Sequence, residues 1–302
     1  MLRFRAVGRT HDGLIRPHNE DAGYVGPYFL LVADGVGGSV AGEVAAASTA
    51  YVVTSAVLAG GSGDPMAVLT DAIGLSHDHL MDGCRQVPER RGMSTTLTAL
   101  LCDGERIAVA HIGDSRAYRW HRGELTQITT DHTLVQSLID DGHLSAEQAM
   151  TYPYRNVVLK ALNADDQPQP DTEWVHLAVG DLILVCSDGL SDLVSDELIA
   201  RTLRTAGSDA AALGDPGVGA REGDRFDLDL AVDRLIQAAL AAGGRDNVTC
   251  VLAEVIQGDR TLPFGTALGA FVPDNLINGT ACRLTETSTG GRAIVLDHSL
   301  AC

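Results

Sequence analysis

Short apolar runs, each bounded by Gly or Asp, recur along the chain and predict β-strands. Their richness in Val, Ile, Leu and Thr is typical of strands that bury at least one face. The predicted strands are Phe29–Ala33, Thr96–Cys102, Arg106–Ile112, Ala117–Trp120, Leu182–Cys186 and Val248–Val255. Asp103-Gly104, between two of these runs, predicts a hairpin, and His121-Arg122-Gly123 predicts another tight turn.

Apolar residues at helical spacing predict three long helices. They are Ala41–Leu58, Pro65–Met81 and Leu228–Ala241. Asp64 is the expected N-cap of the second helix, and Gly243-Gly244 ends the third. Two consecutive long helices followed by a run of strands do not fit βαβ alternation. We therefore predict an α+β fold in which helices pack outside antiparallel sheets.

Two internal segments interrupt this pattern. Residues His132–Asn163 form a separate excursion, with short helices predicted at Leu134–Asp141 and Ala146–Met150. Residues Ala206–Asp227 are rich in Gly, Ala and Asp, which predicts a mobile surface insert. Neither segment contributes to the predicted sheets.

Length and composition fit one large domain with a small appendage. The 302 residues are 45% hydrophobic and 21% charged, which is ordinary for soluble globular proteins. The pattern degrades after Val255, so we expect a domain over residues 1–257 and a loosely attached appendage over 258–302. No apolar run approaches the ~20 residues that cross a bilayer, and Met1–Arg5 lacks the apolar stretch of a signal peptide. We therefore expect a monomeric cytoplasmic protein with no membrane partner.

The net charge disfavours a nucleic-acid-binding protein, and the cysteine spacing disfavours disulfides and cysteine metal sites. The chain has 22 basic and 40 acidic residues, a net charge of -18, whereas nucleic-acid binding needs a basic footprint. The cysteines show no Cys-x-x-Cys spacing, and Cys102, Cys186 and Cys250 lie in or beside strand-like runs, so buried free thiols are expected. His111 lies on an apolar strand and is expected to be a hydrogen-bonded core residue, while His132 has no partner identifiable from the sequence.

Acidic residues recur where the predicted strands begin or end. They form the pairs Asp34-Gly35, Asp188-Gly189 and Asp246-Asn247, a fourth pair Glu20-Asp21, and Asp114 after its own apolar run. Converging carboxylates without histidine ligands suit hard cations such as Mg²⁺ or Mn²⁺. Each pair taken singly is also consistent with an ordinary turn or a helix cap. Together they predict a metal-dependent enzyme that acts on phosphate.

Hydrolysis of a phosphomonoester needs a nucleophile at neutral pH and relief of negative charge on the phosphoryl oxygens. Two divalent ions ~3.5–4 Å apart supply both. Asp34 could bridge two ions, with the Gly35 carbonyl near one of them, and Asp192 could face a cation from a helical turn. Arg16 could present its planar fork to the phosphate, although an exposed salt bridge with Glu20 is the alternative.

Taken together and in order, these segments resemble the metal-dependent protein serine/threonine phosphatases of type 2C, the PPM family, over roughly residues 3–256. The matching stretches are Gly13–Asp21, Val32–Gly38, Gly92–Leu97, His111–Arg116, Ser187–Leu190 and Gly244–Thr249. The resemblance implies a four-layer α-β-β-α sandwich, in which two antiparallel sheets are flanked by helix pairs. It also implies a metal site at one edge and a small flap subdomain at about residues 132–163.

The resemblance assigns roles around two central Mn²⁺ or Mg²⁺ ions. Asp34, Asp188 and Asp246 match the direct ligands of these ions, with the Gly35 carbonyl on one of them. Arg16 matches the arginine that binds the substrate phosphate. These five residues are the core of the predicted site.

A second set of residues matches the periphery of the family's site. Glu20 and Asp21 match the acidic pair near the metals, and Asp114 and Asp192 match positions that hold a third metal in bacterial members. Many eukaryotic members have a histidine directly after the Asp-Gly pair, where this chain has Val36. The resemblance is therefore to the bacterial branch.

The implied activity is hydrolysis of phosphoserine and phosphothreonine on proteins, by in-line attack of a hydroxide that bridges two metals. The implied partners are phosphorylated protein substrates of a cytoplasmic Ser/Thr kinase. Two alternatives stay open: a catalytically weak or regulatory phosphatase-fold protein in partner-switching signalling, and a phosphatase of small metabolites. Loss of metal carboxylates would mark the regulatory class, and none of the expected ones is missing.

Overall fold

Two antiparallel sheets lie at the centre of the computed structural model, which describes residues 1–36, 41–60, 63–149, 151–212 and 226–258 and the backbone of three short C-terminal strands. The five-stranded sheet has the order β1 (Leu2–His11), β12 (Val248–Gln257), β11 (Leu182–Cys186), β7 (Arg116–His121), β8 (Glu124–Gln127). The six-stranded sheet has the order β10 (Asp171–Val175), β6 (Ile107–Ile112), β5 (Leu97–Cys102), β3 (Phe29–Asp34), β2 (Asp21–Val25), β13 (Ile277–Asn278).

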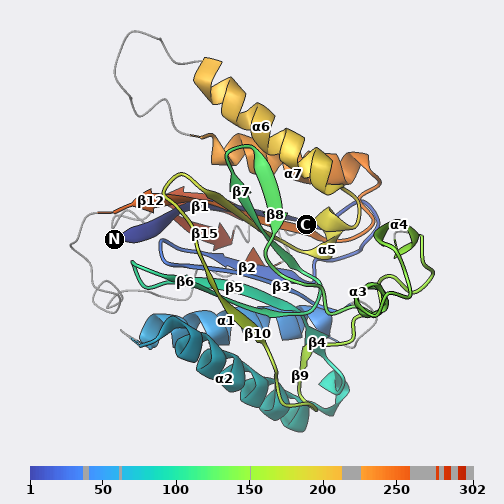
Figure 1. Ribbon diagram of the computed structural model, residues 1–302. Coiled ribbons are helices and arrows are strands. Elements are labelled where there is room, and N and C mark those ends of the chain that lie inside the picture. Colours follow the sequence, from blue (N-terminus) through green and yellow to red (C-terminus); the bar gives the residue numbers. More distant parts are fainter. Residues whose placement is uncertain are drawn as a thin grey trace.

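Helices cover the outer face of each sheet (Figure 1). α1 (Gly42–Ala59) and α2 (Pro65–Gln86) pack on the six-stranded sheet, and α6 (Asp196–Ala212) and α7 (Leu228–Ala241) pack on the five-stranded sheet. The shorter elements are η1 (Pro88–Arg90), β4 (Ser94–Thr95), α3 (Leu134–Asp140), α4 (Ala146–Ala149), β9 (Leu162–Asn163), α5 (Asp188–Ser191), β14 (Cys282–Glu286) and β15 (Arg292–Leu296). The predicted four-layer α-β-β-α sandwich is confirmed.

Burial on both faces explains the nearly continuous apolar runs in the sequence. On β12, Val251, Ala253 and Val255 contribute to the core between the two sheets, while Cys250 and Leu252 contribute to the core beneath α6 and α7. Successive side chains of a strand point to opposite faces, so a strand covered on both faces is apolar at every position. The same two-sided burial recurs on β3, β5, β6 and β11.

Helix α1 is apolar because it packs against a sheet. It is the one helix in the described ranges that is long and apolar enough to span a membrane by length and composition. Its Ala45, Ala46, Ala50 and Val53 are fully buried in the core formed with β2, β3 and α2. Small residues at helical spacing let the helix backbone approach the sheet closely, and this accounts for its composition.

The predicted strands, helices and hairpins are present with small shifts at their ends. The turn after β7 is a tight hairpin with positive φ at Arg122 and Gly123, as its sequence predicted. Strands β1, β2, β8 and β10 and helix α6 were not predicted. β1 is amphipathic: Arg5 donates to Glu254 at 2.6 Å and Arg9 to Asp229 at 2.7 Å, which obscures its apolar face in the sequence.

The predicted mobile insert is wrong for its first part. Residues 206–212 belong to helix α6, and Asp227 is the N-cap of α7, accepting from the Leu230 amide at 2.9 Å. Their Gly and Ala content obscured an amphipathic helix whose Leu203 and Ala206 are buried against the five-stranded sheet. Residues 213–225 and Met150 lie outside the described residues.

Parts of residues 258–302 are described as strand backbone. β13 pairs antiparallel with β2 at the edge of the six-stranded sheet, and β14 pairs with β15. The remainder of the predicted appendage lies outside the described residues. The division of the chain at residue 257 stays a prediction.

The Asp64 cap of α2 offers a direct test of local stability. Its carboxylate accepts from the amides of Met66 at 3.0 Å and Ala67 at 3.3 Å, and Pro65 occupies the first helical position. Asp64→Ala should lower the free energy of unfolding by about 1 kcal/mol, because these amides lose their acceptor. Urea unfolding measures the loss. The exposed mid-helix Asp78→Ala is the control, and an equal loss there would contradict the capping role.

Candidate active site

The predicted acids gather because strands of both sheets begin or end at one edge. In the six-stranded sheet, Asp21 at the start of β2 is the register partner of Asp34 at the end of β3. In the five-stranded sheet, β11 and β12 pair up to Cys186, so that Asp188 lies two residues after the end of β11 and Asp246 two residues before the start of β12. The packing of one sheet on the other brings these acids together at this edge.

Asp21 is the most deeply buried member of the cluster. Its Oδ2 accepts from Ser187 Oγ at 2.8 Å and from Thr249 Oγ1 at 2.6 Å, across to the other sheet. Its Oδ1 is buried and has no hydrogen-bond partner among the described residues. Burial raises the pKa of Asp21 to about 6, although the two hydroxyl donors oppose that rise. Such an orphaned carboxylate oxygen lacks a cation or a donor.

Asp34 and Asp188 lie beside it, and the charge of Asp21 contributes to the raised pKa of both. The pKa of Asp34 is well above its usual value, because of burial first and then of the neighbouring Asp21 and Asp188. The pKa of Asp188 is also well above its usual value, again through burial first and then through nearby carboxylates, of which Asp114 contributes most. Repulsion of this kind shows that the structure holds these carboxylates close to one another.

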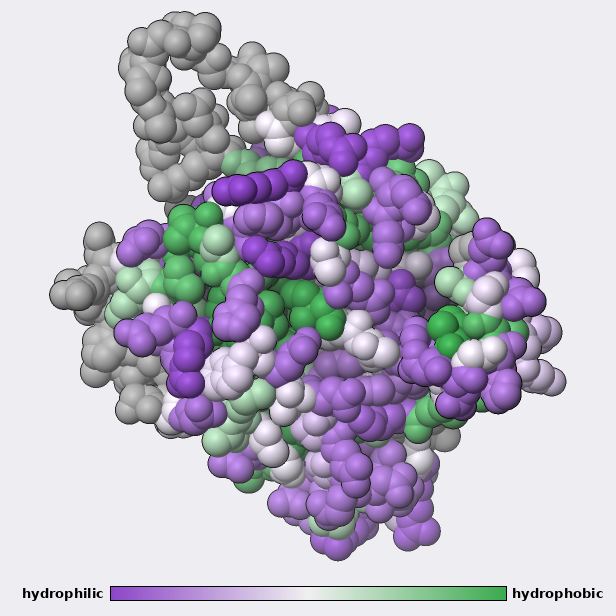
Figure 2. All heavy atoms as spheres, in the orientation of Figure 1, coloured by the Kyte–Doolittle hydropathy of each residue, from purple (hydrophilic) through white to green (hydrophobic). Residues whose placement is uncertain are grey.

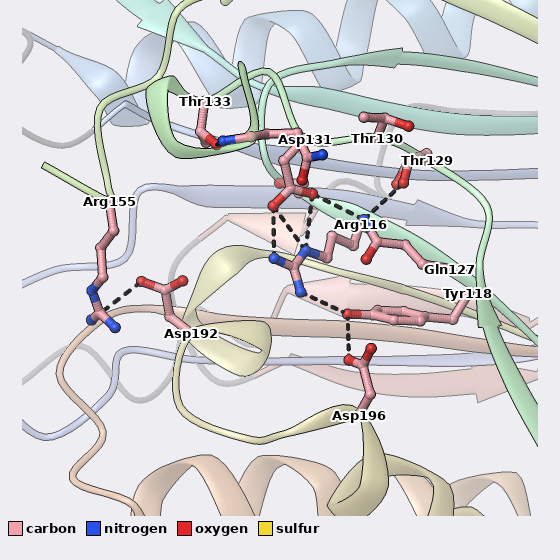
Figure 3. Close-up of polar contacts among 12 residues, drawn as sticks. Arg116, Tyr118, Gln127, Thr129, Thr130, Asp131, Thr133, Arg155, Asp192 and Asp196 are labelled. Carbon is pink, nitrogen blue, oxygen red and sulfur yellow. Dashed lines mark hydrogen bonds and ion pairs between the residues drawn. The ribbon is translucent and has the colours of Figure 1, made fainter. Parts of the chain in front are cut away.

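Asp114 and Asp192 form the outer part of the same cluster. Asp114 lies in the turn between β6 and β7 and is 8% exposed. Burial, followed by Asp131 and Asp192, raises its pKa to about 7. Asp192 follows α5, where its amide donates to the Asp188 carbonyl at 2.8 Å, and its carboxylate faces Arg155 at 3.7 Å (Figure 3). The predicted spacing of Asp188 and Asp192 on one helical turn is therefore confirmed.

Arg16, Glu20 and Asp246 lie on the solvent side of the cluster. Arg16 Nη2 donates to Asp246 Oδ2 at 2.6 Å, and this contact is the main cause of the raised pKa of Arg16. Burial and the nearby Glu43 raise the pKa of Glu20, while Arg16 opposes the rise. The guanidinium has five N–H donors, and this bond occupies one of them. The Arg16 side chain therefore contacts the carboxylate cluster and is not part of an isolated surface salt bridge.

Glycines allow the backbone segments of the site to approach one another. A Cβ at Gly189 would lie 1.9 Å from the Asn247 carbonyl oxygen, and a Cβ at Gly35 would lie 2.5 Å from the Gly42 carbonyl carbon. Any side chain at either position would collide with backbone. The glycine after Asp34 therefore has a packing role at the start of α1, in addition to the predicted exposure of its carbonyl.

Asn247 fixes the loop that carries Arg16 and Glu20. Its Oδ1 accepts from the Glu20 amide at 2.8 Å, and its Nδ2 donates to the carbonyls of Asp12 at 2.9 Å and His18 at 3.0 Å. The Asn247 side chain is buried, so these three hydrogen bonds take the place of hydrogen bonds to water. Sequence reasoning assigned it no role, because an Asp-Asn turn has the same local pattern.

Threonine hydroxyl groups hold the backbone amide and carbonyl of Asp34. The Asp34 amide donates to Thr96 Oγ1 at 3.0 Å, and Thr95 Oγ1 donates to the Asp34 carbonyl at 2.8 Å. Thr96 Oγ1 also contacts Ser115 Oγ at 2.8 Å, next to Asp114. No role was predicted for these residues, although they lie within the stretches Gly92–Leu97 and His111–Arg116 that match the family.

Two histidines near the site have structural partners. His111 is buried, with Nδ1 against Thr98 Oγ1 at 2.9 Å and Nε2 against the Thr130 carbonyl at 3.1 Å, so the prediction of a hydrogen-bonded core residue is confirmed. Burial lowers its pKa to about 4. His132, for which the sequence identified no partner, contacts Gly113 and Asp171 with its ring. These partners come from distant parts of the chain.

Comparison with known proteins places this arrangement in a family. The family model for protein phosphatase 2C matches residues 18–213. The serine/threonine protein phosphatase PstP of Mycobacterium tuberculosis is 38% identical over 258 residues, 85% of this chain and 46% of PstP. The serine/threonine phosphatase stp of Listeria welshimeri is 32% identical over 257 residues, 82% of this chain and 94% of that protein.

The chain belongs to the protein phosphatase 2C family. A solved structure of the PstP catalytic domain in complex with two manganese ions aligns with a TM-score of 0.72 at 37% identity, over 85% of this chain and 100% of that one. The structure of Stp1 from Staphylococcus aureus aligns with a TM-score of 0.73 at 31% identity, over 84% and 96% of the two chains. This phosphatase 2C chain spans about half the length of PstP.

The donor set of this phosphatase 2C site fits a hard divalent cation. The clustered ligand candidates offer carboxylate oxygens, one of them a buried oxygen without a partner, and burial followed by neighbouring carboxylates raises their pKa values. Within the described part of the chain, no three acidic, histidine or cysteine side chains already surround a single metal position.

A cavity adjoins the outer acids of this phosphatase 2C chain. It has a volume of about 610 Å³ and lies between the predicted flap, which contributes Thr133, Gln136 and Arg155, and the segment that follows β11. Asp114 and Asp188 are among the residues that line it. Figure 2 shows that hydrophilic residues cover most of the viewed face, with an apolar patch to its left.

The raised pKa values predict how stability depends on pH. The folded pKa values of Asp21, about 6, and Asp114, about 7, exceed the unfolded value of 3.8, so the folded state binds more protons. This contribution to stability is fully present below about pH 4 and is lost as pH rises through 6 to 7. Metal-free protein should therefore have a lower Tm at pH 8 than at pH 5.5.

Divalent cations should reverse this loss by compensating the carboxylates. Adding Mn²⁺ or Mg²⁺ at pH 8 should raise Tm, measured by calorimetry, while Na⁺ at matched ionic strength is the control. A Tm that is independent of both pH and divalent cation would show that the cluster is not under electrostatic strain.

Proposed function

We propose that this chain is a metal-dependent protein serine/threonine phosphatase. The observation that carries the proposal is the set of carboxylates at one sheet edge, with an orphaned buried oxygen on Asp21 and with Arg16 attached at the solvent side. Family membership supports the same activity, since its relatives PstP and stp are named serine/threonine phosphatases. The regulatory alternative is not favoured, because the acids whose loss would mark it are present and gathered.

In this proposal the residues at the sheet edge hold two divalent ions. Asp34, Asp188 and Asp246 would be direct ligands, with the Gly35 carbonyl on one ion and Glu20 and Asp21 beside them, directly or through water. When bound, Mn²⁺ or Mg²⁺ supplies a hydroxide nucleophile near neutral pH and neutralises charge on the phosphoryl group. Asp114 and Asp192, at the outer end of the cluster, would hold a third ion.

The protein's own groups bind and orient the substrate. The Arg16 guanidinium matches the geometry of two phosphate oxygens and would exchange its bond to Asp246 for the substrate. The hydroxyls of Ser187 and Thr249 hold the Asp21 carboxylate, and Asn247 holds the loop that carries Arg16. These contacts restrain the Arg16 loop and the carboxylate cluster relative to each other. Preorganisation of this kind lowers the reorganisation needed during reaction.

Exposed apolar residues around the site favour a protein substrate over a small metabolite. Leu14 and Ile15, directly before Arg16, are 62% and 70% exposed, and Tyr154 of the predicted flap is 61% exposed. Large apolar side chains exposed beside a polar site are typical of protein contact surfaces. A cytoplasmic kinase as the opposing enzyme, a cytoplasmic location and a monomeric state stay predictions.

Activity and ligand identity can be tested together. The purified protein should hydrolyse para-nitrophenyl phosphate with Mn²⁺ and lose that activity in EDTA. Asp34→Asn and Asp246→Asn should each lower kcat by about a hundredfold or more, because each removes a charged ligand. Asp34→Asn should also raise the Tm of the metal-free protein, since it removes a carboxylate that burial and its neighbours destabilise.

The matched control for these variants is the exposed Asp78→Asn on α2, which should leave both activity and Tm unchanged. Hydrolysis that continues unchanged in EDTA would defeat the metal-dependent proposal. Full activity in Asp34→Asn or Asp246→Asn would remove that residue from the ligand set.

The role of Arg16 predicts a specific kinetic change. Arg16→Ala should raise KM for a phosphothreonine peptide by about tenfold while changing kcat less, because it removes a contact to bound phosphate. Arg16→Lys should recover only part of the loss, since an ammonium cannot bind two oxygens in a planar fork. Steady-state kinetics measures both constants. A normal KM in Arg16→Ala would show that another residue binds the phosphate.

A further inference from the structure

The segment that leads into the flap is hydrogen-bonded along the turn that carries Asp114. Arg116, at the end of this turn, donates to both carboxylate oxygens of Asp131 at 2.7–3.0 Å. The Ala117 amide donates to Thr129 Oγ1 at 3.0 Å. Figure 3 shows Arg116, Thr129 and Asp131 side by side. The turn and the start of the flap are therefore parts of one hydrogen-bonded unit.

His132 closes this unit at its inner end. Its backbone amide donates to the Gly113 carbonyl at 2.7 Å, and its ring Nδ1 accepts from the Gly113 amide at 3.0 Å. Both polar groups of the residue before Asp114 are thus held by one residue. The His132 carbonyl accepts from the Leu159 amide at 2.8 Å, which joins the two ends of the flap.

The opposite side of the same ring faces the end of the flap. Because Nδ1 accepts a hydrogen bond, the neutral ring carries its proton on Nε2, which lies 3.1 Å from Asp171 Oδ2 and 3.3 Å from Lys160 Nζ. Lys160 donates to Asp171 Oδ1 at 2.6 Å, so both donors share one carboxylate. The ring stacks on His111 at 4.8 Å between centroids and is 12% exposed. Its orientation is therefore fixed on two edges and one face.

We propose that His132 is a positioning residue with two separable actions. Its Nδ1 edge holds the turn of Asp114, and thereby the outer end of the carboxylate cluster. Its Nε2 edge holds the end of the flap through Asp171 and Lys160. The inference rests on the proposed function, because it assigns the first action to cation binding and the second to binding of a protein substrate.

Two substitutions separate these actions. His132→Asn places an amide oxygen where Nδ1 stands, so it keeps an acceptor for the Gly113 amide and loses the donor to Asp171. His132→Gln places an amide nitrogen near the position of Nε2, so it keeps a donor to Asp171 and leaves the Gly113 amide without its acceptor. Asp171→Asn removes the shared carboxylate while leaving the ring in place. His143→Gln, on an exposed flap residue, is the matched control.

The two edges predict different kinetic changes. His132→Gln should raise the Mn²⁺ concentration for half-maximal hydrolysis of para-nitrophenyl phosphate by about tenfold, because the Asp114 turn loosens. His132→Asn should keep that concentration within about twofold of the unsubstituted protein. His132→Asn and Asp171→Asn should each raise KM for a phosphothreonine peptide by about fivefold, because the flap end loses its anchor. His143→Gln should change neither quantity.

Hydrogen exchange of the metal-free protein gives a readout that does not depend on activity. Resolved by NMR, the Gly113 amide should exchange faster in His132→Gln than in the unsubstituted protein, and His132→Asn should restore its protection. Similar behaviour of His132→Gln and His132→Asn in every measurement would overturn the proposal, because the ring would then act only by filling space. Unchanged exchange in His132→Gln would overturn it as well. If the unsubstituted protein hydrolyses no phosphoester, the proposed function fails, and the exchange comparison alone decides the role of His132.

Discussion

The structure depends on one constraint: several carboxylates lie close together in a buried position at one edge of the two sheets. Asp21, Asp34 and Asp188 come from different segments of the chain, and burial, followed by the like charge of neighbouring carboxylates, raises the pKa of all three. Without a compensating cation their proximity is unfavourable, and the fold supplies the stability that keeps them there. The opposing stabilisation comes from the three apolar cores between the four layers.

Neutral polar groups make this concentration of charge possible. Ser187 and Thr249 donate to Asp21, and Thr95 and Thr96 fix the backbone of Asp34. These groups add no charge of their own, so they orient the carboxylates without neutralising their negative charge. A cation can then enter a site whose ligands are already confined to one edge, which lowers the ordering entropy of binding. Arg16 is the one cationic residue in direct contact with Asp246 among the described ion pairs.

The flap is connected to the site through backbone as much as through side chains. The segment before it runs along the Asp114 turn, and Arg155 within it faces Asp192. The cavity beside the outer acids is thus bounded by a part of the chain that also contacts the residues around those acids. Its shape and the position of Asp114 are set together, because one hydrogen-bonded unit contributes to both.

The sequence by itself determined the strands β3, β5, β6, β11 and β12 and the helices α1, α2 and α7, because these elements depend on local periodicity. It also determined the identity of the acids, because each is a residue type placed near a strand end. It missed β1, whose arginines pair with Glu254 and Asp229 and mask its apolar face, and the helical part of 206–212, whose Gly and Ala resemble a linker. Only the tertiary structure decided that Asn247 holds the Arg16 loop and that His132 holds Gly113. These contacts join residues far apart in the chain, and no local pattern encodes a hydrogen bond whose partner is chosen by the packing of two sheets.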